Sequence, residues 1–333
     1  MKSKIDFVIT WVDGNDPRWQ KEKRKYEPIG DDSGNTADRY RDWGCLKYFF
    51  RGVEKYATWV NKVFFITCGQ KPDWLNTEHK KLVCVTHNDF IPKEHLPTFN
   101  SNAIQVNLHR INDLSENFVL FDDDVFIINK VRPVDFFYHG LPCNSAVMSP
   151  IITTDKNDRF PQIALNNLGV INSHFKKNVE FKRNPFKWIN PKYKTHLIKT
   201  LCMLPWNYFP GFREGHISNS LRKSTIRKIW NMEYDIMNKT SGSKFRNNAY
   251  DINHWLFSEW DIASGNFHPR DIDFGKYFCY GKDSKAIYAA IRNSRYKVVC
   301  LNDSGNRCDF EKEKARTVKV FDAKFPKKSG FEL

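Results

Sequence analysis

The stretch IDFVITWV, at Ile5–Val12, is rich in apolar and β-branched residues and stops at the turn signal Asp13–Gly14. A short run of this kind, bounded by a turn, predicts a strand buried in the interior. Three similar runs follow it along the chain: Lys62–Cys68, Leu82–Thr86 and Phe118–Phe121. The chain is therefore expected to build its core around a sheet of buried strands.

Apolar residues at helical spacing separate these runs, at residues 41–57 and at Asn102–Ile111. Strands that alternate with helices predict an α/β fold, with a mixed, largely parallel sheet flanked by helices. Ligands bind such sheets beyond the carboxyl ends of the strands. Polar residues directly follow all four runs: Asp13, Gly69–Gln70, His87–Asn88–Asp89 and Asp122–Asp124. We expect these four groups to meet at one edge of the sheet and to form the active site.

The sequence pattern divides the chain into three parts. Residues 1–150 form the α/β core, residues 151–290 are basic, aromatic and mostly helical, and residues 291–333 return to a strand and a helix that complete the core. The middle part carries four helical candidates: Arg159–Phe175, Pro191–Met203, Ser218–Met237 and Tyr250–Ile262. Since no repeat or low-complexity linker separates the parts, the middle one is interpreted as a helical insertion into a single fold.

The chain is strongly basic, with 53 Lys and Arg against 38 Asp and Glu, a net charge of +15. A positive field favours anionic partners: a nucleotide, a phosphorylated polymer, an anionic membrane surface or nucleic acid. No helix-turn-helix signature, zinc spacing or RNP-like motif is present, which argues against nucleic acid. Basic pairs concentrate between residues 175 and 230. These basic pairs could bind an anionic polymer, or they could bind the anionic lipids of the inner membrane leaflet.

Several features of the sequence favour the cytoplasm. The chain opens with MKSK, which leads directly into a strand rather than a secretory segment. Its apolar stretches are far shorter than the roughly 18 residues that span a bilayer. Cys68, Cys84 and Cys300 lie within apolar strand-like runs, where cysteine usually behaves as a small buried hydrophobe. We therefore expect reduced thiols in a cytoplasmic protein.

Three consecutive carboxylates, Asp122, Asp123 and Asp124, stand between apolar runs on either side. Such carboxylates are costly to bury unless a positive group neutralises them. Mg²⁺ or Mn²⁺ does so with oxygen ligands and also bridges to substrate phosphates. The D-x-D spacing of Asp122 and Asp124 is similar to that of nucleotide-sugar enzymes of the GT-A type, which implies a GT-A-like fold. We predict a metal site at the three aspartates; the alternative is an exposed acidic turn.

Two further clusters hold residue types suited to catalysis. His216 could accept a proton from an alcohol, with Lys223 downstream to neutralise phosphoryl oxygens. On a helix, Asn102, Gln105 and His109 fall on one polar stripe. An isolated histidine or polar stripe is more often structural, so these clusters alone assign no function.

A set of segments occurs in a fixed order along the chain. They are IDFVITWVDGNDPRW (Ile5–Trp19), the block Arg41–Phe126 with TCGQ, HNDFIP and FDDDVFI, and then GHISNSLRKS, SKFR and VVCLND. Together they resemble the four characteristic blocks of the Stealth family, which comprises bacterial capsular polysaccharide phosphotransferases. The family also contains the catalytic subunit of the eukaryotic lysosomal-enzyme N-acetylglucosamine-1-phosphotransferase.

This resemblance implies roles for particular residues. His216, Arg246 and Asp124 match residues expected to be catalytic, and Asp123 completes the family's paired aspartates. The residues expected to bind substrate are Asp13, Arg41, Asp42, Gly69, Gln70, Gln105, Arg110, Lys223, Asn302 and Asp303.

Two positions depart from the family pattern. Asp122 stands where the family often has Asn, which adds a carboxylate to the metal site. Gln105 stands where many relatives have Glu, so a general base at that position would be missing here. The second departure favours His216 as the base, and leaves Gln105 to hold a sugar hydroxyl.

The resemblance implies transfer of a hexose 1-phosphate, such as N-acetylglucosamine 1-phosphate, from a nucleoside-diphosphate sugar to an acceptor hydroxyl. A UDP-sugar is the favoured donor, and the acceptor is an oligosaccharide or polysaccharide, either free or lipid-linked at the inner membrane face. The main alternative is an ordinary GT-A glycosyltransferase, which attacks the anomeric carbon and releases the nucleoside diphosphate. Another is a non-catalytic carbohydrate-binding module, because tryptophans suit sugar stacking, although tryptophan is more often a core residue.

Overall fold

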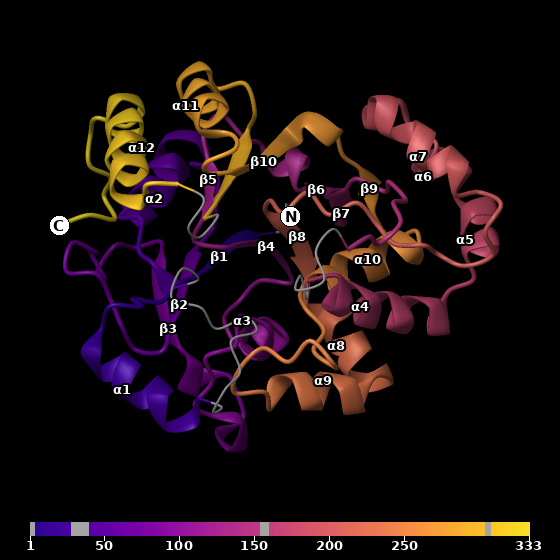
Figure 1. The fold of residues 1–333 in the computed structure, drawn as a ribbon, viewed down its shortest axis with the longest axis horizontal. Helices are drawn as coiled ribbons and strands as arrows, with labels where there is room; N and C mark the ends of the chain where they lie inside the picture. Colours follow the sequence, from indigo (N-terminus) through magenta and orange to yellow (C-terminus); the bar gives the residue numbers. More distant parts are fainter. Residues whose placement is uncertain (1–3, 28–39, 154–159, 304–307) are drawn as a thin grey trace.

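The computed structural model describes residues 4–27, 40–153, 160–303 and 308–333, and a five-stranded sheet lies at its centre (Figure 1). The strands follow the order β3-β2-β1-β4-β8: β3 Leu82–Thr86, β2 Val63–Thr67, β1 Ile5–Thr10, β4 Asn117–Phe121 and β8 Asn219–Arg222. The first four strands are parallel, whereas β8 is antiparallel to β4. The predicted α/β class, with a mixed, largely parallel sheet flanked by helices, is confirmed.

Both faces of this sheet are buried, because the side chains of a strand point alternately to opposite sides. In β1, Phe7 and Ile9 join one hydrophobic core, and Val8 joins the other. Three helices contribute to the first core: α2 Leu46–Tyr56, α11 Ser284–Asn293 and α12 Phe310–Lys324. The second core takes most of its helical residues from α4 Phe160–His174, α8 Lys223–Met232 and α10 Trp255–Ala263.

A three-stranded sheet brings the last part of the chain to the tip of β4. Its order is β10-β11-β5, with bounds β10 Gly275–Cys279, β11 Val298–Asn302 and β5 Val125–Ile127. Because β5 starts directly after Asp124 and pairs antiparallel with β11, the C-terminal strand runs beside the three carboxylates. A third, small sheet consists of β6 Phe137–Tyr138, β7 Leu141–Asn144 and β9 His268–Pro269.

The remaining elements are short and surround these sheets (Figure 1). The helices are α1 Pro17–Tyr26, α3 Ser101–Gln105, α5 Lys177–Arg183, α6 Pro185–Trp188, α7 Leu197–Cys202 and α9 Tyr234–Ser241. Short 3₁₀ segments occur at His87–Asp89, Lys93–His95, Leu108–Arg110, Pro133–Asp135, Pro191–His196 and Ile272–Phe274. Within the described ranges, no helix combines the length and the apolar character that crossing a bilayer requires.

The helix predicted over Asn102–Ile111 is wrong in length. Helix α3 ends at Gln105, and a 3₁₀ turn follows at Leu108–Arg110. The side-chain amide of Asn107 donates to the Ala103 carbonyl at 2.8 Å. In a continuous helix that carbonyl would accept from the Asn107 backbone, so the side chain competes with the helix and ends it.

The helix predicted over Ser218–Met237 is also wrong at its start. Residues 219–222 instead form β8, because the free edge of β4 pairs with them and Asn117 lies opposite Arg222. The rest of the segment forms two helices, α8 and α9. The middle part of the chain thus adds one strand to the central sheet, while its boundaries at residues 150 and 290 stay a prediction.

Three other differences from the predicted elements are local. The helix predicted over Pro191–Met203 is interrupted where Lys194 has a φ of 51°, so only its second half forms α7. The helix predicted from Tyr250 begins at Trp255. The predicted helix start at Arg159 lies outside the described residues. Elements α1, β10 and α11 were not predicted.

Candidate active site

The loops after β1 and β2 are tied together at the edge of the sheet. The side-chain oxygen of Gln70 accepts a hydrogen bond from the Asp13 amide at 2.9 Å, and its amide donates to the Asp13 carbonyl at 3.1 Å. The same amide donates to the Asp16 carboxylate at 3.0 Å. Gly69 has a φ of 108°, a left-handed conformation that a side chain would disfavour. The structure therefore brings Asp13, Gly69 and Gln70 together, with Gln70 holding the Asp13 loop.

Arg41 and Asp303 join the two ends of the chain beside this loop. Their ion pair has an Nη2–Oδ1 distance of 3.1 Å. Trp43 donates to the other carboxylate oxygen of Asp303 at 3.1 Å and stacks on Tyr280 with ring centroids 4.0 Å apart. Asn302 donates to the Asp303 carbonyl at 2.9 Å. These contacts fix the loop after β11 against the segment that precedes α2.

A cavity of about 280 Å³ opens next to Asp13 and Asp42. Its lining combines aromatic rings with charged groups: Trp11, Asp13, Asp42, Gly44, Leu46, Lys71, Pro72, Asp73 and Trp74. Asp42 is also close enough to Asp123 to help raise the pKa of that carboxyl. The cavity therefore lies near the three carboxylates.

The three carboxylates occupy the turn between β4 and β5. The turn is closed by the Val125 amide, which donates to the Asp122 carbonyl at 3.0 Å, and the Leu301 amide of β11 donates to the Asp124 carbonyl at 2.9 Å. Surrounding protein, and then the charges of Asp124 and Asp122, raise the pKa of Asp123 to about 8. Asp123 is exposed, so solvent screens part of this effect.

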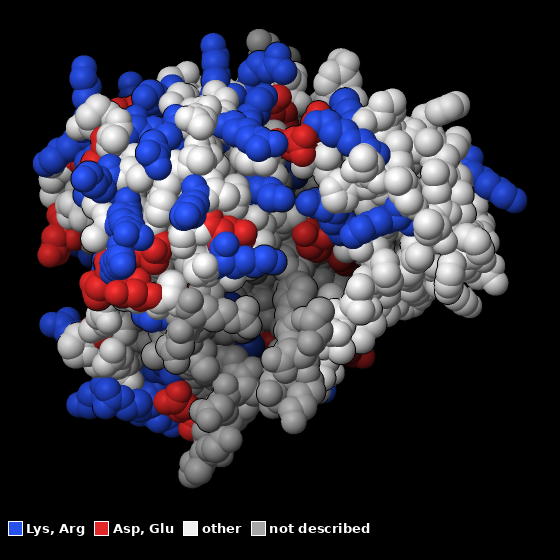
Figure 2. Space-filling model, turned by 45° about the horizontal axis from the view of Figure 1, so that its top comes forward, with Lys and Arg blue, Asp and Glu red and all other residues white. Residues whose placement is uncertain are grey.

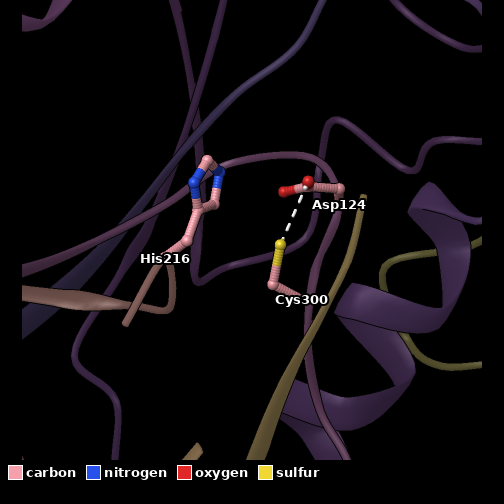
Figure 3. A group of neighbouring side chains, drawn as sticks. All are labelled: Asp124, His216 and Cys300. Atoms are coloured by element: carbon pink, nitrogen blue, oxygen red, sulfur yellow. Dashed lines mark hydrogen bonds between the residues drawn. The ribbon is translucent and has the colours of Figure 1, made fainter. Parts of the chain in front are cut away.

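Asp124 is the carboxylate that meets other reactive side chains. Burial raises its pKa, while the nearby His216 acts in the opposite direction. Figure 3 shows Asp124 facing both His216 and Cys300, and a ligand atom of each lies within 4.8 Å of the other two. Cys300 donates to Asp124 Oδ2 at 3.2 Å. Asp124 Oδ1 is buried and has no hydrogen-bond partner among the described residues.

This arrangement could hold a metal ion. Three aspartates are adjacent in the chain, and the structure adds an imidazole and a thiol beside Asp124. Of the three cysteines expected to be buried, Cys300 is fully buried, whereas the expectation is wrong for Cys68 and Cys84, which are exposed. The Cys300 thiol contacts Asp124 and does not only fill the core. The identity of the ion is not decided by these ligands, because carboxylate oxygen suits Mg²⁺ and Mn²⁺ whereas imidazole and thiolate suit softer metals.

His216 is held in a strained conformation three residues before β8 begins. Its φ is 43°, in the left-handed region that residues other than glycine rarely occupy. Its ring contacts those of Trp255 and Tyr277, with centroid distances of 5.5 Å and 5.4 Å. These rings orient the imidazole toward Asp124. The family motif identifies the residue, and its strain supports a functional role.

A buried chain of hydrogen bonds extends from Asp122. Gln105 donates to Asp122 Oδ1 at 3.0 Å, and its oxygen lies 2.8 Å from His254 Nδ1. Since that oxygen can only accept, His254 carries its proton on Nδ1 and leaves Nε2 as an acceptor. Nε2 is buried without a partner in the described ranges. Burial lowers the pKa of His254 to about 4, so the ring is neutral.

Arg246 lies on the same side as His254. Its Nη2 donates to the Ser101 hydroxyl at 2.7 Å, at the start of α3. Its charge helps to keep the pKa of His254 low, together with that of His216. The structure thus brings Arg246, Gln105 and His216 into the neighbourhood of the carboxylates.

Two predicted substrate-binding residues are not brought to this site. Lys223 follows β8 at the opposite end of β4, and its ammonium donates to the carbonyls of Ile111 and Leu114 at 2.6 Å and 3.2 Å. Lys223 is buried, and these bonds stabilise the loop that holds Ile111 and Leu114. Arg110 bonds to Asn107 and lies over the Trp230 ring, 4.8 Å from its centroid. In this structure the charged groups of both residues are thus engaged within the protein.

The fold and the site are those of an α/β enzyme with carboxylates and a histidine at the edge of a sheet. The chain matches the family models "Stealth protein CR1, conserved region 1" at residues 3–31 and "Stealth protein CR2, conserved region 2" at residues 39–143. It is 46% identical to capsular polysaccharide phosphotransferase WcwK of Streptococcus pneumoniae, over 98% of both chains.

Two further relatives are similar over nearly their whole length. Receptor polysaccharide phosphotransferase WefC of Streptococcus oralis is 39% identical, over 99% of this chain and 100% of its own. Exopolysaccharide phosphotransferase cps2G of Lactiplantibacillus plantarum is 37% identical, over 98% and 96%. The chain belongs to the Stealth family.

Solved structures give only a distant likeness. The galactosyltransferase LgtC, in complex with donor and acceptor sugar analogues, has a TM-score of 0.40 and 11% identity, covering 96% of this chain and 95% of that chain. Mouse xyloside xylosyltransferase 1 has a TM-score of 0.34 and 11% identity, covering 91% and 97%. These scores are too low to support an argument about the site.

Sequence reasoning missed His254 and underrated Cys300. Both lie in segments that were assigned by their apolar pattern alone, a helix and a strand. Their contacts with Gln105 and Asp124 join residues 149 and 176 positions apart. The signal that could have found them is proximity to family blocks, since His254 follows SKFR and Cys300 lies within VVCLND.

Proposed function

We propose that this protein transfers a sugar 1-phosphate from a nucleoside-diphosphate sugar to a hydroxyl of an acceptor saccharide, in the synthesis of a capsular or extracellular polysaccharide. The observation that carries the proposal is the juxtaposition of Asp124 and His216 at the edge of the sheet. The names of the full-length relatives, all polysaccharide phosphotransferases, support the reaction class.

The donor is proposed to lie between the cavity at Asp13 and the three carboxylates. The cavity of about 280 Å³ has aromatic rings to stack on a base and the Lys71 ammonium to meet a phosphate. Asp13, Asp42 and the loop held by Gln70 would contact the nucleoside. A UDP-sugar is the proposed donor, on the family resemblance.

Mg²⁺ or Mn²⁺ is proposed at the carboxylates. The residues fit such an ion: burial, and after it the neighbouring carboxylates, raise the pKa values of Asp123 and Asp124, and Asp124 Oδ1 is buried without a partner among the described residues. Asp123 and Asp124 would hold the ion, with Asp122 fixed by Gln105 next to them. When bound, the ion supplies positive charge that neutralises the pyrophosphate oxygens.

His216 is the proposed general base. It takes the proton of the acceptor hydroxyl, whose oxygen attacks the β-phosphorus of the donor. The bond from that phosphorus to the oxygen shared with the α-phosphate breaks, and the nucleoside monophosphate leaves with this oxygen. Asp124 stabilises the imidazolium that forms, and Arg246 neutralises charge on the phosphoryl oxygens. No bond to the anomeric carbon breaks, so its configuration is kept.

The product identifies the reaction. The purified protein would be incubated with a panel of nucleotide sugars, Mg²⁺ or Mn²⁺ and short saccharide acceptors. We expect release of the nucleoside monophosphate and a phosphodiester resonance in the ³¹P spectrum of the saccharide product. Release of the nucleoside diphosphate, with no phosphorus in the product, would show glycosyl transfer instead and overturn the proposal.

The place of action is proposed to be the cytoplasmic side of the membrane, where nucleotide sugars are available. Figure 2 shows lysine and arginine side chains spread over one face of the molecule instead of gathered in one patch. With a net charge of +15, such a surface suits an anionic polymer or an anionic leaflet. If the acceptor is lipid-linked, the basic surface would bind the anionic leaflet that carries it.

A further inference from the structure

A second, smaller cavity shares His216 with the carboxylate site. It has a volume of about 40 Å³, and its lining includes Asn144, Arg213, Glu214, His216 and Arg270. Neither Asp124 nor Cys300 lines it, so His216 is the residue common to the two sites. A single water needs roughly 10–15 Å³ of such space, so the cavity admits a small charged group.

The cavity presents hydrogen-bond donors that the described protein does not satisfy. Nε and Nη1 of Arg270 and Nδ2 of Asn144 are buried and have no acceptor within the described ranges. The Asn144 side chain belongs to a residue only 4% exposed. Donors left unpaired in the interior are unfavourable, and buried polar groups are normally paired. The arrangement therefore indicates a ligand that supplies acceptor atoms.

The donors are held rigidly by the small sheet. Residue Asn144 of β7 lies opposite Pro269 of β9, and the Arg270 amide donates to the Asn144 carbonyl at 2.9 Å. The Ser145 hydroxyl donates to the Arg270 carbonyl at 3.1 Å. This backbone pairing places both residues in the lining of the cavity, where a guanidinium and a side-chain amide suit the oxygens of a phosphate or carboxylate.

The charge of the cavity also favours an anion. Burial lowers the pKa of Arg270 to about 10, and it lowers the pKa of Arg213 as well, because neither guanidinium gains enough from nearby carboxylates. Glu214 faces both, and Asp271 at the rim is paired with Lys194 at 3.3 Å. Glu214 also hydrogen-bonds to the buried carboxyl group of Glu259, and burial raises the pKa of both carboxyl groups. The two guanidiniums thus face a pair of carboxyl groups whose charged forms burial disfavours, which leaves positive charge in excess.

We infer that this cavity binds an anionic group of the acceptor saccharide, next to the hydroxyl that reacts at His216. The inference rests on the proposed function, since His216 is there the base that the acceptor must reach. A hydroxyl in contact with His216 brings its own sugar to the mouth of the cavity, where Arg270 and Asn144 can bind a phosphate or carboxylate substituent. The enzyme therefore selects acceptors that already carry negative charge.

The test compares three acceptors built on one sugar: a neutral glycoside, the same glycoside with a phosphodiester substituent, and one with a carboxylate. With the wild-type protein, we expect an acceptor KM at least about tenfold lower for one or both anionic forms, at equal donor KM. A preference for the phosphodiester would assign the cavity to a phosphate of the growing polymer, and a preference for the carboxylate to an acidic sugar.

Variants test whether the preference for anionic acceptors arises in this cavity. Arg270→Gln should remove the preference for anionic acceptors, and Arg270→Lys should retain part of it, because the charge stays but the paired N–H groups are lost. Arg132→Gln, at an exposed arginine paired with Asp135, is the matched control and should retain the preference. Donor binding, measured by calorimetry, should be unchanged in all three variants.

Two results would separate the claims. Equal KM values for the three acceptors in the wild-type protein, with monophosphate released normally, would overturn this inference and leave the proposed function intact, the cavity then holding water alone. No monophosphate from any acceptor would overturn the proposed function itself. The wild-type comparison decides the inference even if Arg270→Gln does not fold.

Discussion

The two sides of the active site differ in how their polar groups are bonded. On the Asp13 side, the Gln70 side chain makes three hydrogen bonds within the protein, and Arg41 pairs with Asp303. On the His216 side, buried atoms of Asp124, His254 and Arg270 have no partner among the described residues. The first side is organised by bonds within the protein, whereas the second keeps buried polar atoms available to a bound metal ion or substrate.

The largest effect on activity is expected at His216, on the side of the site whose buried polar atoms lack partners among the described residues. His216→Ala should lower kcat by about 10²–10⁴-fold, because a positioned general base is lost. Monophosphate release measures this effect, and the melting temperature checks the fold. His139→Ala is the matched control, since His139 is exposed and has a similar positive φ of 49°. Activity within about threefold of wild type would remove His216 from the mechanism.

Arg246 should come next. Arg246→Ala is expected to lower kcat by about 10²–10³-fold, since a charge that meets the transferred phosphoryl group is removed. Arg246→Lys should recover part of the loss, and the exposed Arg227→Ala serves as control. If Arg246→Ala raised only the donor KM and left kcat unchanged, Arg246 would belong to binding and not to the transition state.

A substitution at Gln70 tests the role of the Asp13 side of the site. Gln70→Ala removes the bonds that hold the Asp13 loop, so the donor KM should rise by about tenfold while kcat stays within about threefold of wild type. Initial rates at varied donor concentration give both quantities. A large fall in kcat with an unchanged donor KM would erase the contrast between the two sides.

The smallest effect concerns stability and pH. The folded pKa of Asp123 is raised from 3.8 to about 8, so the unfolded chain loses its proton first and stability falls as pH rises between these values. Asp123→Asn should therefore raise the melting temperature of the metal-free protein at pH 8, by about 1–2 °C after solvent screening, and leave it unchanged near pH 4. Thermal scans without divalent cations measure this. A lower melting temperature at pH 8 would contradict the assigned shift.

The sequence predicts the organised side better than the other. Strands β1, β2 and β4 are apparent as apolar runs because both of their faces are buried, whereas β3 lies at the edge of the sheet with Cys84 exposed. Polar residues after β1, β2 and β4 are brought to the site, but the hydrogen bonds of Asp89 after β3 are local, to Thr86. Local pattern also gives the carboxylates, and the family motif gives His216.

The rest depends on distant contacts that no local pattern records. Strand β8 forms because it pairs with the free edge of β4. Lys223 lies away from the site because its ammonium donates to carbonyls more than a hundred residues earlier in the chain. Helix α3 is short because the side chain of Asn107 takes the Ala103 carbonyl. His254 and Arg270 become candidates for ligand binding only because the fold buries their nitrogens without a partner among the described residues.

The cooperation of Asp124 and His216 is tested most directly by a double-mutant cycle on kcat. Groups that act as one unit are strongly non-additive, so Asp124→Asn combined with His216→Ala should be no more than about threefold slower than the slower single variant. If the two losses instead multiplied, the carboxylate and the imidazole would act independently, and the proposed mechanism would be wrong.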